Sequence, residues 1–241
     1  MGKAVVGVLA ALLVGAGITA AGWLIGDGFR DGRTAERIVT VKGLAEREAK
    51  ADLALWPMRF VATSDELATA QAELARAEAA VLDFLTSGGI GRQSIEVQGI
   101  EVIDRLAQAY QSGPIESRFI INENLMVRST DVDVIKALSQ DVGRLVEAGV
   151  VLSSEGFRGP FYLFTGLNAI KPEMIAEATA NARAGAEQFA ADSMSEVAGI
   201  QRASQGLFQI LPRDQAPGQS EELQVMKTIR VVTTIDYRLA D

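Results

Sequence analysis

The sequence contains neither histidine nor cysteine, and both absences limit the chemistry open to this protein. Without histidine it lacks the commonest general base and the usual zinc ligand, so Ser-His-Asp and Cys-His nucleophile systems are excluded. Without cysteine it has no disulfide and no thiolate, which fits an oxidising compartment. Any catalysis would need Asp, Glu, Lys, Tyr or a bound cofactor. We therefore expect a protein that is not an enzyme and that holds no cofactor or metal.

Positive charge is scarce as well. The 241 residues include 23 Lys and Arg against 31 Asp and Glu, which gives a formal net charge of −8. An acidic surface repels phosphate backbones, so nucleic acid is not an expected partner. The hydrophobic fraction of 48% is enough for a real core, in one large domain or two small ones.

One long stretch has no charge at all. Residues 4–26 read AVVGVLAALLVGAGITAAGWLIG and follow Lys3. As a helix this run would extend roughly 34 Å, which exceeds the ~30 Å apolar core of a bilayer. Trp23 lies near its far end, where an interfacial indole is common. We expect a transmembrane signal anchor at residues 1–26, a linker at 27–36 and an α+β domain at 37–241.

Two other interpretations of this stretch stay open. A secretory signal could be cleaved at a small-residue site such as Thr19-Ala20-Ala21, which would remove residues 1–21. The run could also be a buried helix of a soluble domain, although it is long for that. An anchor and a cleaved signal both place the domain outside the cytoplasm, whereas the arginines after the run leave the reverse orientation open.

The segment Ser87–Gly91 (SGGIG) has the glycine content of a phosphate-binding loop. Glycines that bind phosphate follow a strand and precede a helix, whose free N–H groups face the ligand. Here the order is reversed, because the amphipathic run 63–85 comes before the glycines and the strand-like run 94–103 comes after them. We therefore interpret Gly88 and Gly89 as a helix end, where glycine takes a left-handed conformation easily.

A helix, a glycine, a β-branched residue and a strand follow one another three times, in SGGI, EAGV and VAGI. This succession predicts helices over 63–85, 131–149 and 171–199, with Pro172 in the first turn of the last. Apolar alternation predicts strands at 38–41, 53–62, 94–103, 118–127 and 225–239. Pro57 indicates an edge strand or a bulge. The expected fold is α+β, with strand–helix–strand repeats forming a mixed or antiparallel sheet packed by helices and preceded by one transmembrane helix.

No strong catalytic or metal-binding motif is present. The candidate site is a polar cluster around the start of the third helix, formed by Asn168, Lys171, Asn181 and Arg183. Such a cluster would suit an anion near a helix N-terminus, although helix capping and surface solvation explain these residues more simply. Alanines recur between residues 176 and 191, and they indicate either close packing in the core or a subunit contact.

The segment VTVKGLAEREAKADLALWPMRF, which starts at Val39, resembles the opening of the SIMPL domain. Members begin with V-x-G-x-(G/A), followed by D-x-A and a strand. The matching residues here are Val41, Gly43, Ala45, Asp52 and Ala54. Later segments, from GGI with IEVQGIEV to EATANARAGAEQFA with VAGI, follow the family's order over residues 38–239. Many members have a proline just before the aspartate, where this chain has Lys50 and Ala51.

The resemblance implies an α+β domain of a bacterial envelope protein. The family includes periplasmic, surface-immunogenic and oxidative-stress-associated proteins, some of which form ring-like homo-oligomers, and no enzymatic mechanism is established for it. We therefore expect a single-pass protein of the bacterial inner membrane, held in the lipid bilayer by residues 4–26. Its periplasmic domain would act by self-assembly or binding in envelope integrity or stress defence. A carboxylate-based envelope hydrolase and a small-ligand binding module remain as alternatives.

Overall fold

The computed structural model describes residues 2–31, 37–108, 116–153 and 159–240, and it divides the chain into two compact units. Unit 1 comprises residues 1–43, 180–204 and 233–241, and unit 2 comprises residues 44–179 and 205–232. Three long elements contribute to both units, namely β1 (Ile38–Lys50), α5 (Leu167–Asp192) and β9 (Met226–Ala240).

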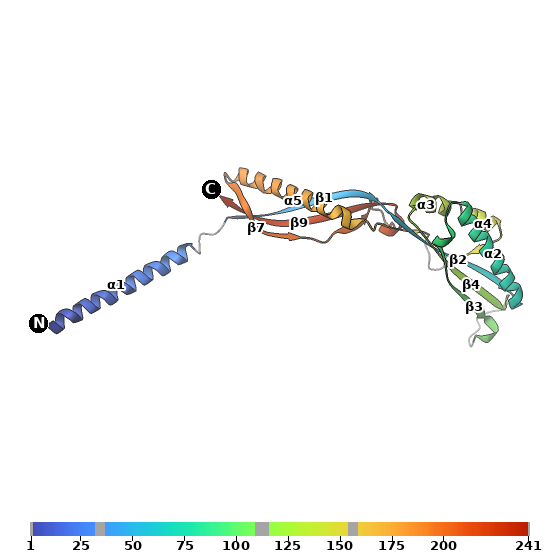
Figure 1. The fold of residues 1–241 in the computed structure, drawn as a ribbon, viewed down its shortest axis with the longest axis horizontal. Coiled ribbons are helices and arrows are strands. Elements are labelled where there is room, and N and C mark those ends of the chain that lie inside the picture. Colours follow the sequence, from blue (N-terminus) through green and yellow to red (C-terminus); the bar gives the residue numbers. More distant parts are fainter. Residues whose placement is uncertain (1, 32–36, 109–115, 154–158, 241) are drawn as a thin grey trace. The chain divides into compact units, whose positions relative to one another are not determined.

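Helix α1 (Gly2–Asp31) belongs to unit 1 and includes the whole apolar run 4–26 (Figure 1). It also continues through residues 27–31 of the predicted linker, whereas residues 32–36 lie outside the described part of the chain. Side chains are described continuously from Leu13 to Gly26, and all of them are exposed. Within the described residues, no helix combines the length and the apolar character needed to cross a membrane. The transmembrane role predicted for α1 is therefore not confirmed.

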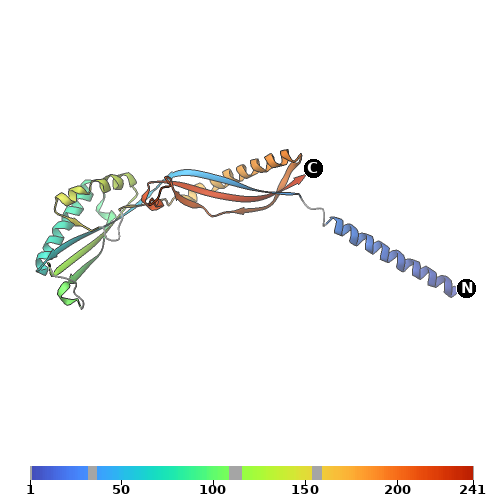
Figure 2. The same ribbon diagram turned by 180° about the vertical axis from the view of Figure 1, so that it is seen from behind.

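The first of two antiparallel sheets, here called sheet I, has the strand order β1-β9-β7, and β8 (Gln209–Pro212) also pairs with β9. Strand β7 runs over Glu196–Gln205. Odd-numbered residues of β9 from Lys227 to Tyr237 are buried, which confirms the face that the alternation predicts. Helix α5 packs on this face of the sheet (Figures 1 and 2).

Alanines at every fourth position form the buried side of α5. In unit 1, Ala182 and Ala186 lie in a cluster with Ile235 and Tyr237 of β9. In unit 2, Ala178 lies in a separate cluster with further side chains of β1 and β9. Side chains four residues apart share one face of a helix, so the alanines present a smooth stripe to the sheet. Close packing within the chain, one of the two interpretations of these alanines, is confirmed.

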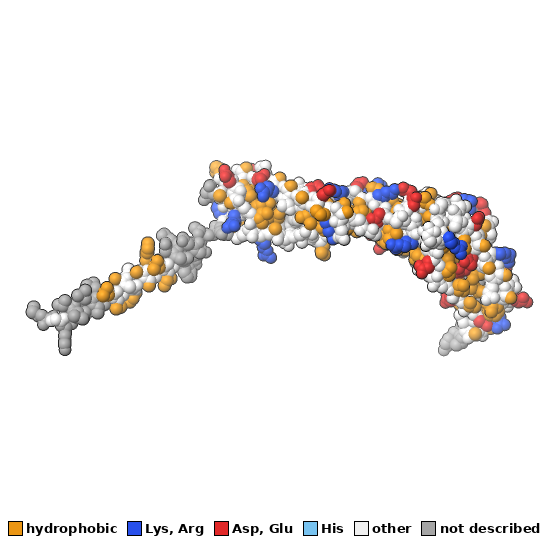
Figure 3. Space-filling view, viewed as in Figure 1, with side chains coloured by type: hydrophobic (Ala, Val, Ile, Leu, Met, Phe, Trp, Pro, Cys, Tyr) orange, Lys and Arg blue, Asp and Glu red, His pale blue; other side chains and the backbone are white. Residues whose placement is uncertain are grey.

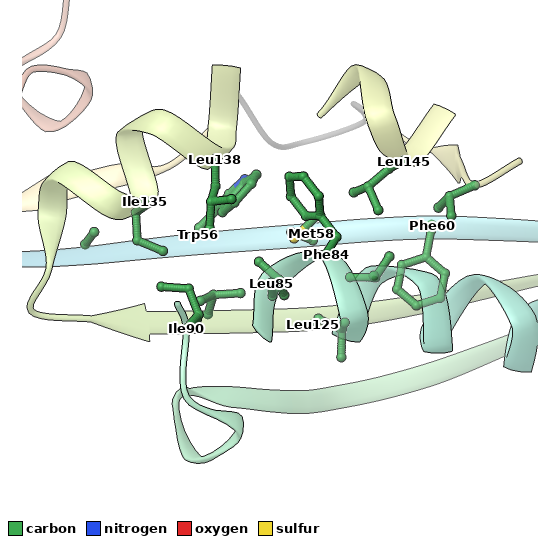
Figure 4. Packing of buried hydrophobic residues seen from close by; sticks show 14 of the residues in the cluster. Trp56, Met58, Phe60, Phe84, Leu85, Ile90, Leu125, Ile135, Leu138 and Leu145 are labelled. Atoms are coloured by element: carbon green, nitrogen blue, oxygen red, sulfur yellow. The ribbon is translucent and has the colours of Figure 1, made fainter. Parts of the chain in front are cut away.

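The second sheet, sheet II, lies in unit 2 and has the order β3-β4-β2-β5, with β6 also paired to β2. Its strands are β2 (Leu53–Ser64), β3 (Ile95–Asp104), β4 (Phe119–Ser129), β5 (Val151–Leu152) and β6 (Phe161–Leu163). The helices α2 (Leu67–Ser87), α3 (Val132–Gln140) and α4 (Gly143–Glu147) cover one face. Figure 4 shows the large side chains of this core, including Phe60, Phe84 and Leu85. The α+β class is thus confirmed.

Pro57 lies in an inner strand, which corrects the expectation of an edge strand. On one side of β2, Pro57 is paired with Met126 of β4. On the other side, β6 pairs with residues 53–55 and β5 with residues 60–61. Pro57 therefore falls where the described ladder on that side is interrupted, and there its missing N–H removes no strand-to-strand hydrogen bond.

Two of the three predicted glycine helix ends are confirmed. Gly89 has φ +95° after α2, and Gly149 has φ +85° after α4. In both cases the next residue closes the end, because Ile90 N donates to Leu85 O at 3.0 Å and Val150 N to Leu145 O at 2.9 Å.

The third predicted helix end is wrong. Helix α5 ends at Asp192, and Gly199 lies inside strand β7. The left-handed residue here is Met194, with φ 55°, and Ser195 N donates to Ala190 O at 2.9 Å in the same pattern. Glycine is favoured at such an end but not required, so a helix end predicted from glycine alone lies too far along the chain.

Two further helix predictions need correction. The predicted helix 131–149 is divided into α3 and α4, and Asp131 caps α3 by accepting from Val134 N at 3.3 Å. Helix α5 begins at Leu167, so Pro172 lies inside the helix rather than in its first turn.

Candidate functional site

Two of the four residues of the predicted polar cluster, Asn168 and Lys171, are in contact with each other. Lys171 Nζ donates to Asn168 Oδ1 at 2.9 Å, near the start of α5. The same ammonium group lies 5.8 Å from the centre of the Phe208 ring. Asn181 and Arg183 lie further along α5, in unit 1. The pair that does meet already has partners inside the chain, and the four-residue site stays a prediction.

The start of α5 is held by Asp52, one of the residues that match the SIMPL motif. Its Oδ1 accepts from Thr165 N at 2.8 Å and its Oδ2 accepts from Gly166 N at 2.9 Å. Both N–H groups come just before the first helical residue, so the carboxylate also faces the positive end of the helix dipole. A Cβ at Gly166 would lie only 3.2 Å from Asp52 Oδ2. The motif aspartate is therefore a capping group.

A cleft of about 680 Å³ opens in unit 2. One wall is the polar side of α3, with Asp133, Lys136, Ser139 and Gln140. Tyr162 of β6 lies against it, and the remaining walls come from Lys50, from the loop after β8 and from the start of β9. Sequence reasoning missed this cleft, because its residues come from five separate segments that only the tertiary fold brings together.

The cleft has fixed walls. Tyr162 is only 5% exposed, and burial raises the pKa of its phenol. Val225 O accepts from Ala51 N at 2.8 Å, which ties the start of β9 to the end of β1. The Gln224 side chain accepts from Asp214 N at 3.0 Å and donates to Asp214 O at 2.8 Å, which holds the loop after β8.

Some charged side chains in the cleft form ion pairs and others do not. Lys50 forms an ion pair with Asp133 across the cleft wall. Arg213 Nη2 lies 2.9 Å from Asp214 Oδ2, and this hydrogen bond lowers the pKa of the aspartate. Lys136 has no carboxylate within ion-pair distance among the described residues.

Sheet II contains a buried acid that carries no hydrogen bond in the described part of the chain. Glu123 is 2% exposed on β4, next to Phe60 of β2 and opposite Ile100 of β3. Loss of solvation raises its pKa to about 7, and the nearby charge of Glu78 adds to the shift. The alternation of Ile121, Leu125 and their neighbours would have placed Glu123 on the apolar face from sequence alone.

No group of three or more Asp and Glu side chains that could hold a metal ion is found among the described residues. Residues 39–237 match the family model SIMPL, described as a protein of unknown function (DUF541). No match was found among curated proteins.

Among solved structures, the regulatory subunit of aspartate kinase from Thermus flavus is similar over 82% of this chain and 89% of that chain. The sequence identity is 17% and the TM-score is 0.19. A TM-score this low does not support a shared fold.

Proposed function

We propose that this chain, which belongs to the SIMPL family, is a membrane-tethered protein that works by binding and self-assembly rather than by catalysis. Its folded domain would lie in the periplasm of a bacterium and serve in envelope integrity or stress defence. The lack of histidine and cysteine favours binding over catalysis.

The tether rests on one observation, the exposed apolar surface of α1. Large apolar side chains are 62% to 71% exposed along its described stretch (Figure 3), namely Leu13, Val14, Ile18, Trp23, Leu24 and Ile25. An apolar surface of this extent favours burial in another apolar medium. Thr19 has the only hydroxyl of the run 4–26, and its Oγ1 donates to Gly15 O at 2.7 Å. A polar group satisfied inside its own helix suits hydrocarbon, where water is absent.

Self-assembly is supported by β3, an edge strand of sheet II. Val97, Ile100 and Val102 are 47%, 58% and 51% exposed on the face of the sheet that also carries the helices. Between Ile95 and Val102, no charged side chain of β3 shares this face. A second copy of the chain suits such an edge, because a two-fold axis pairs the same uncharged surface with itself and completes the main-chain hydrogen bonds.

The tether is tested by membrane extraction of the full-length chain expressed in bacteria. We expect the chain to stay in the membrane pellet after an alkaline wash, and the variant Ile18→Arg to be released. A charge near the middle of a spanning helix opposes insertion by about 2.5–3.5 kcal/mol. Ile18→Leu is the matched control and should stay in the pellet. A soluble chain would disprove the tether, and a mature N-terminus near residue 22 would show a cleaved signal instead.

Orientation is tested on the same cells. Added protease should digest residues 37–241 in spheroplasts but not in intact cells, because the outer membrane protects the periplasm. Protection in spheroplasts as well would place the domain in the cytoplasm.

Assembly is tested by light scattering of the full chain in detergent. We expect more than one copy per particle, and a smaller particle for Ile100→Lys, which puts a charge on the proposed contact. Glu96→Lys changes an exposed residue of the same strand on the opposite face, and it should leave the particle unchanged. A wild-type chain that is strictly monomeric would disprove self-assembly.

A further inference from the structure

We propose that the cleft beside α3 binds a small organic anion, with a carboxylate or phosphate head and a partly apolar body. Nothing in the proposed assembly depends on this cleft, since the strand β3 does not line it.

The head of the ligand is assigned by the charges of the cleft. Asp133 forms an ion pair with Lys50, and Asp214 forms one with Arg213. Lys136 is the one cleft cation for which the described residues supply no carboxylate. Although the chain has a formal net charge of −8, an ammonium group without a paired carboxylate at a concave surface favours an anion.

The hydroxyl groups of Tyr162 and Ser139 lie in the same cleft as Lys136. The Ser139 hydroxyl donates its proton to the Lys136 carbonyl oxygen at 2.8 Å, so the Tyr162 hydroxyl is the one that can donate to a ligand oxygen. An ammonium group together with a phenolic hydroxyl is a set that recognises the oxygens of a carboxylate or a phosphate.

The body of the ligand is assigned by the opposite wall. Leu223, Val225 and Met226 line the cleft from the start of β9 and its preceding turn. Methionine and branched aliphatic side chains favour an apolar group over a second charge. A purely inorganic anion would leave this wall in contact with water.

The walls hold their positions without a ligand, which reduces the entropy lost on binding. Helix α3 is anchored by Ile135 and Leu138, which are 0% and 8% exposed in the core of unit 2. Tyr162 pairs with Ala54 in sheet II, and Val225 is tied to Ala51.

The proposal is tested by isothermal titration calorimetry of the full chain in detergent, with phenyl phosphate as the probe. We expect saturable binding of phenyl phosphate that weakens as salt is added, because the ammonium contact is screened. Inorganic phosphate lacks the apolar body and phenol lacks the anionic head, so both should bind more weakly. Equal binding of phenol and phenyl phosphate would overturn the assignment of the anionic head.

Two variants locate the site. Lys136→Gln should weaken the binding of phenyl phosphate about tenfold or more, which is the loss expected for one charge-assisted hydrogen bond. Tyr162→Phe keeps the buried ring and should weaken the binding of phenyl phosphate by a smaller factor. Lys171→Gln is the matched control, because Lys171 belongs to the cluster predicted from the sequence and does not line the cleft.

Three outcomes would overturn the proposal. The first is the absence of binding of phenyl phosphate at millimolar concentration. The second is an unchanged affinity in Lys136→Gln, and the third is a loss confined to Lys171→Gln, which would move the site to the start of α5. A circular dichroism spectrum equal to that of the parent shows that each variant is folded.

Discussion

Both sheets of this protein carry helices on one face, yet their cores are built from side chains of different size. Under α5 the buried helix residues are mainly alanines, such as Ala178, Ala182 and Ala186. Under α2 the core is filled by Phe60, Phe84 and their aliphatic neighbours. Small residues let a helix approach a sheet closely, whereas large ones interdigitate. Adding atoms should therefore destabilise the core under α5, whereas removing atoms should destabilise the core under α2.

The two sheets also differ in how they bury a charged group. In sheet I, Lys227 is 0% exposed, and its Nζ lies 2.6 Å from Glu221 Oε1. The same ammonium group also donates to the Glu221 carbonyl oxygen. In sheet II, Glu123 is buried with no hydrogen bond to its carboxyl group among the described residues. A paired charge is stable as an ion, while an unpaired carboxyl becomes protonated more readily.

The largest effect is expected in the core of sheet II. Phe60→Ala removes a side chain that is 0% exposed, and it should lower the free energy of unfolding by about 3–5 kcal/mol. Phe189→Ala is the control, because Phe189 is 60% exposed on α5. Urea unfolding monitored by circular dichroism measures the free energy of unfolding of both variants. Similar losses for the two variants would contradict the packing described for sheet II.

The next largest effect concerns the buried pair of sheet I. Glu221→Gln leaves the Lys227 ammonium without its carboxylate, and we expect a loss of about 3–4 kcal/mol. The double variant Glu221→Gln with Lys227→Met removes both charges and should recover most of this loss. If the single variant is as stable as the parent in urea unfolding, the ion pair between Lys227 and Glu221 does not contribute to the stability of sheet I.

Glu123 should make stability depend on pH. Its pKa is about 7 in the folded chain and near 4.5 when unfolded, so the folded state binds the extra proton between these values. The contribution is fully present below pH 4.5 and is lost as pH rises through 7, by about 3 kcal/mol in total. Glu123→Gln cannot titrate and should not show this slope. Parallel pH profiles of unfolding free energy for parent and variant would contradict the prediction.

The smallest effect tests the alanine stripe. Ala182→Leu adds atoms where the residue is 0% exposed, and we expect a loss of about 2 kcal/mol. Ala180→Leu adds the same atoms at an exposed position of the same helix, and should change stability by less than about 0.5 kcal/mol. Urea unfolding distinguishes them, and equal values would mean that α5 is not closely packed.

Regular alternation explains what could be predicted from the sequence. In β9, the odd positions from Lys227 to Tyr237 are the buried ones, because a strand has a strict period of two residues. Helix α2 likewise buries Ala70, Leu74 and Val81 at helical spacing. Such periodic segments specify both their secondary structure and their buried face.

Features that depend on distant residues could not be predicted. The N-cap of α5 comes from Asp52, which is 113 residues before Thr165. The cleft joins Lys50, Lys136 and Arg213, whose spacing in the chain follows no motif. Local rules also failed at Met194, which takes a left-handed conformation usually associated with glycine.

The pairing of β1 with β9 has a consequence for the order of folding. Leu239 N donates to Arg37 O at 2.7 Å, and Thr40 Oγ1 donates to Asp236 Oδ1 across 196 residues of sequence. Sheet II needs only residues 53–163 and can form while later residues are still being synthesised. Sheet I must wait until β9 has emerged, since β9 is its central strand. A nascent chain therefore keeps β1 without its partner strand for almost the whole of its synthesis, and an unpaired strand edge is a template for pairing with another chain.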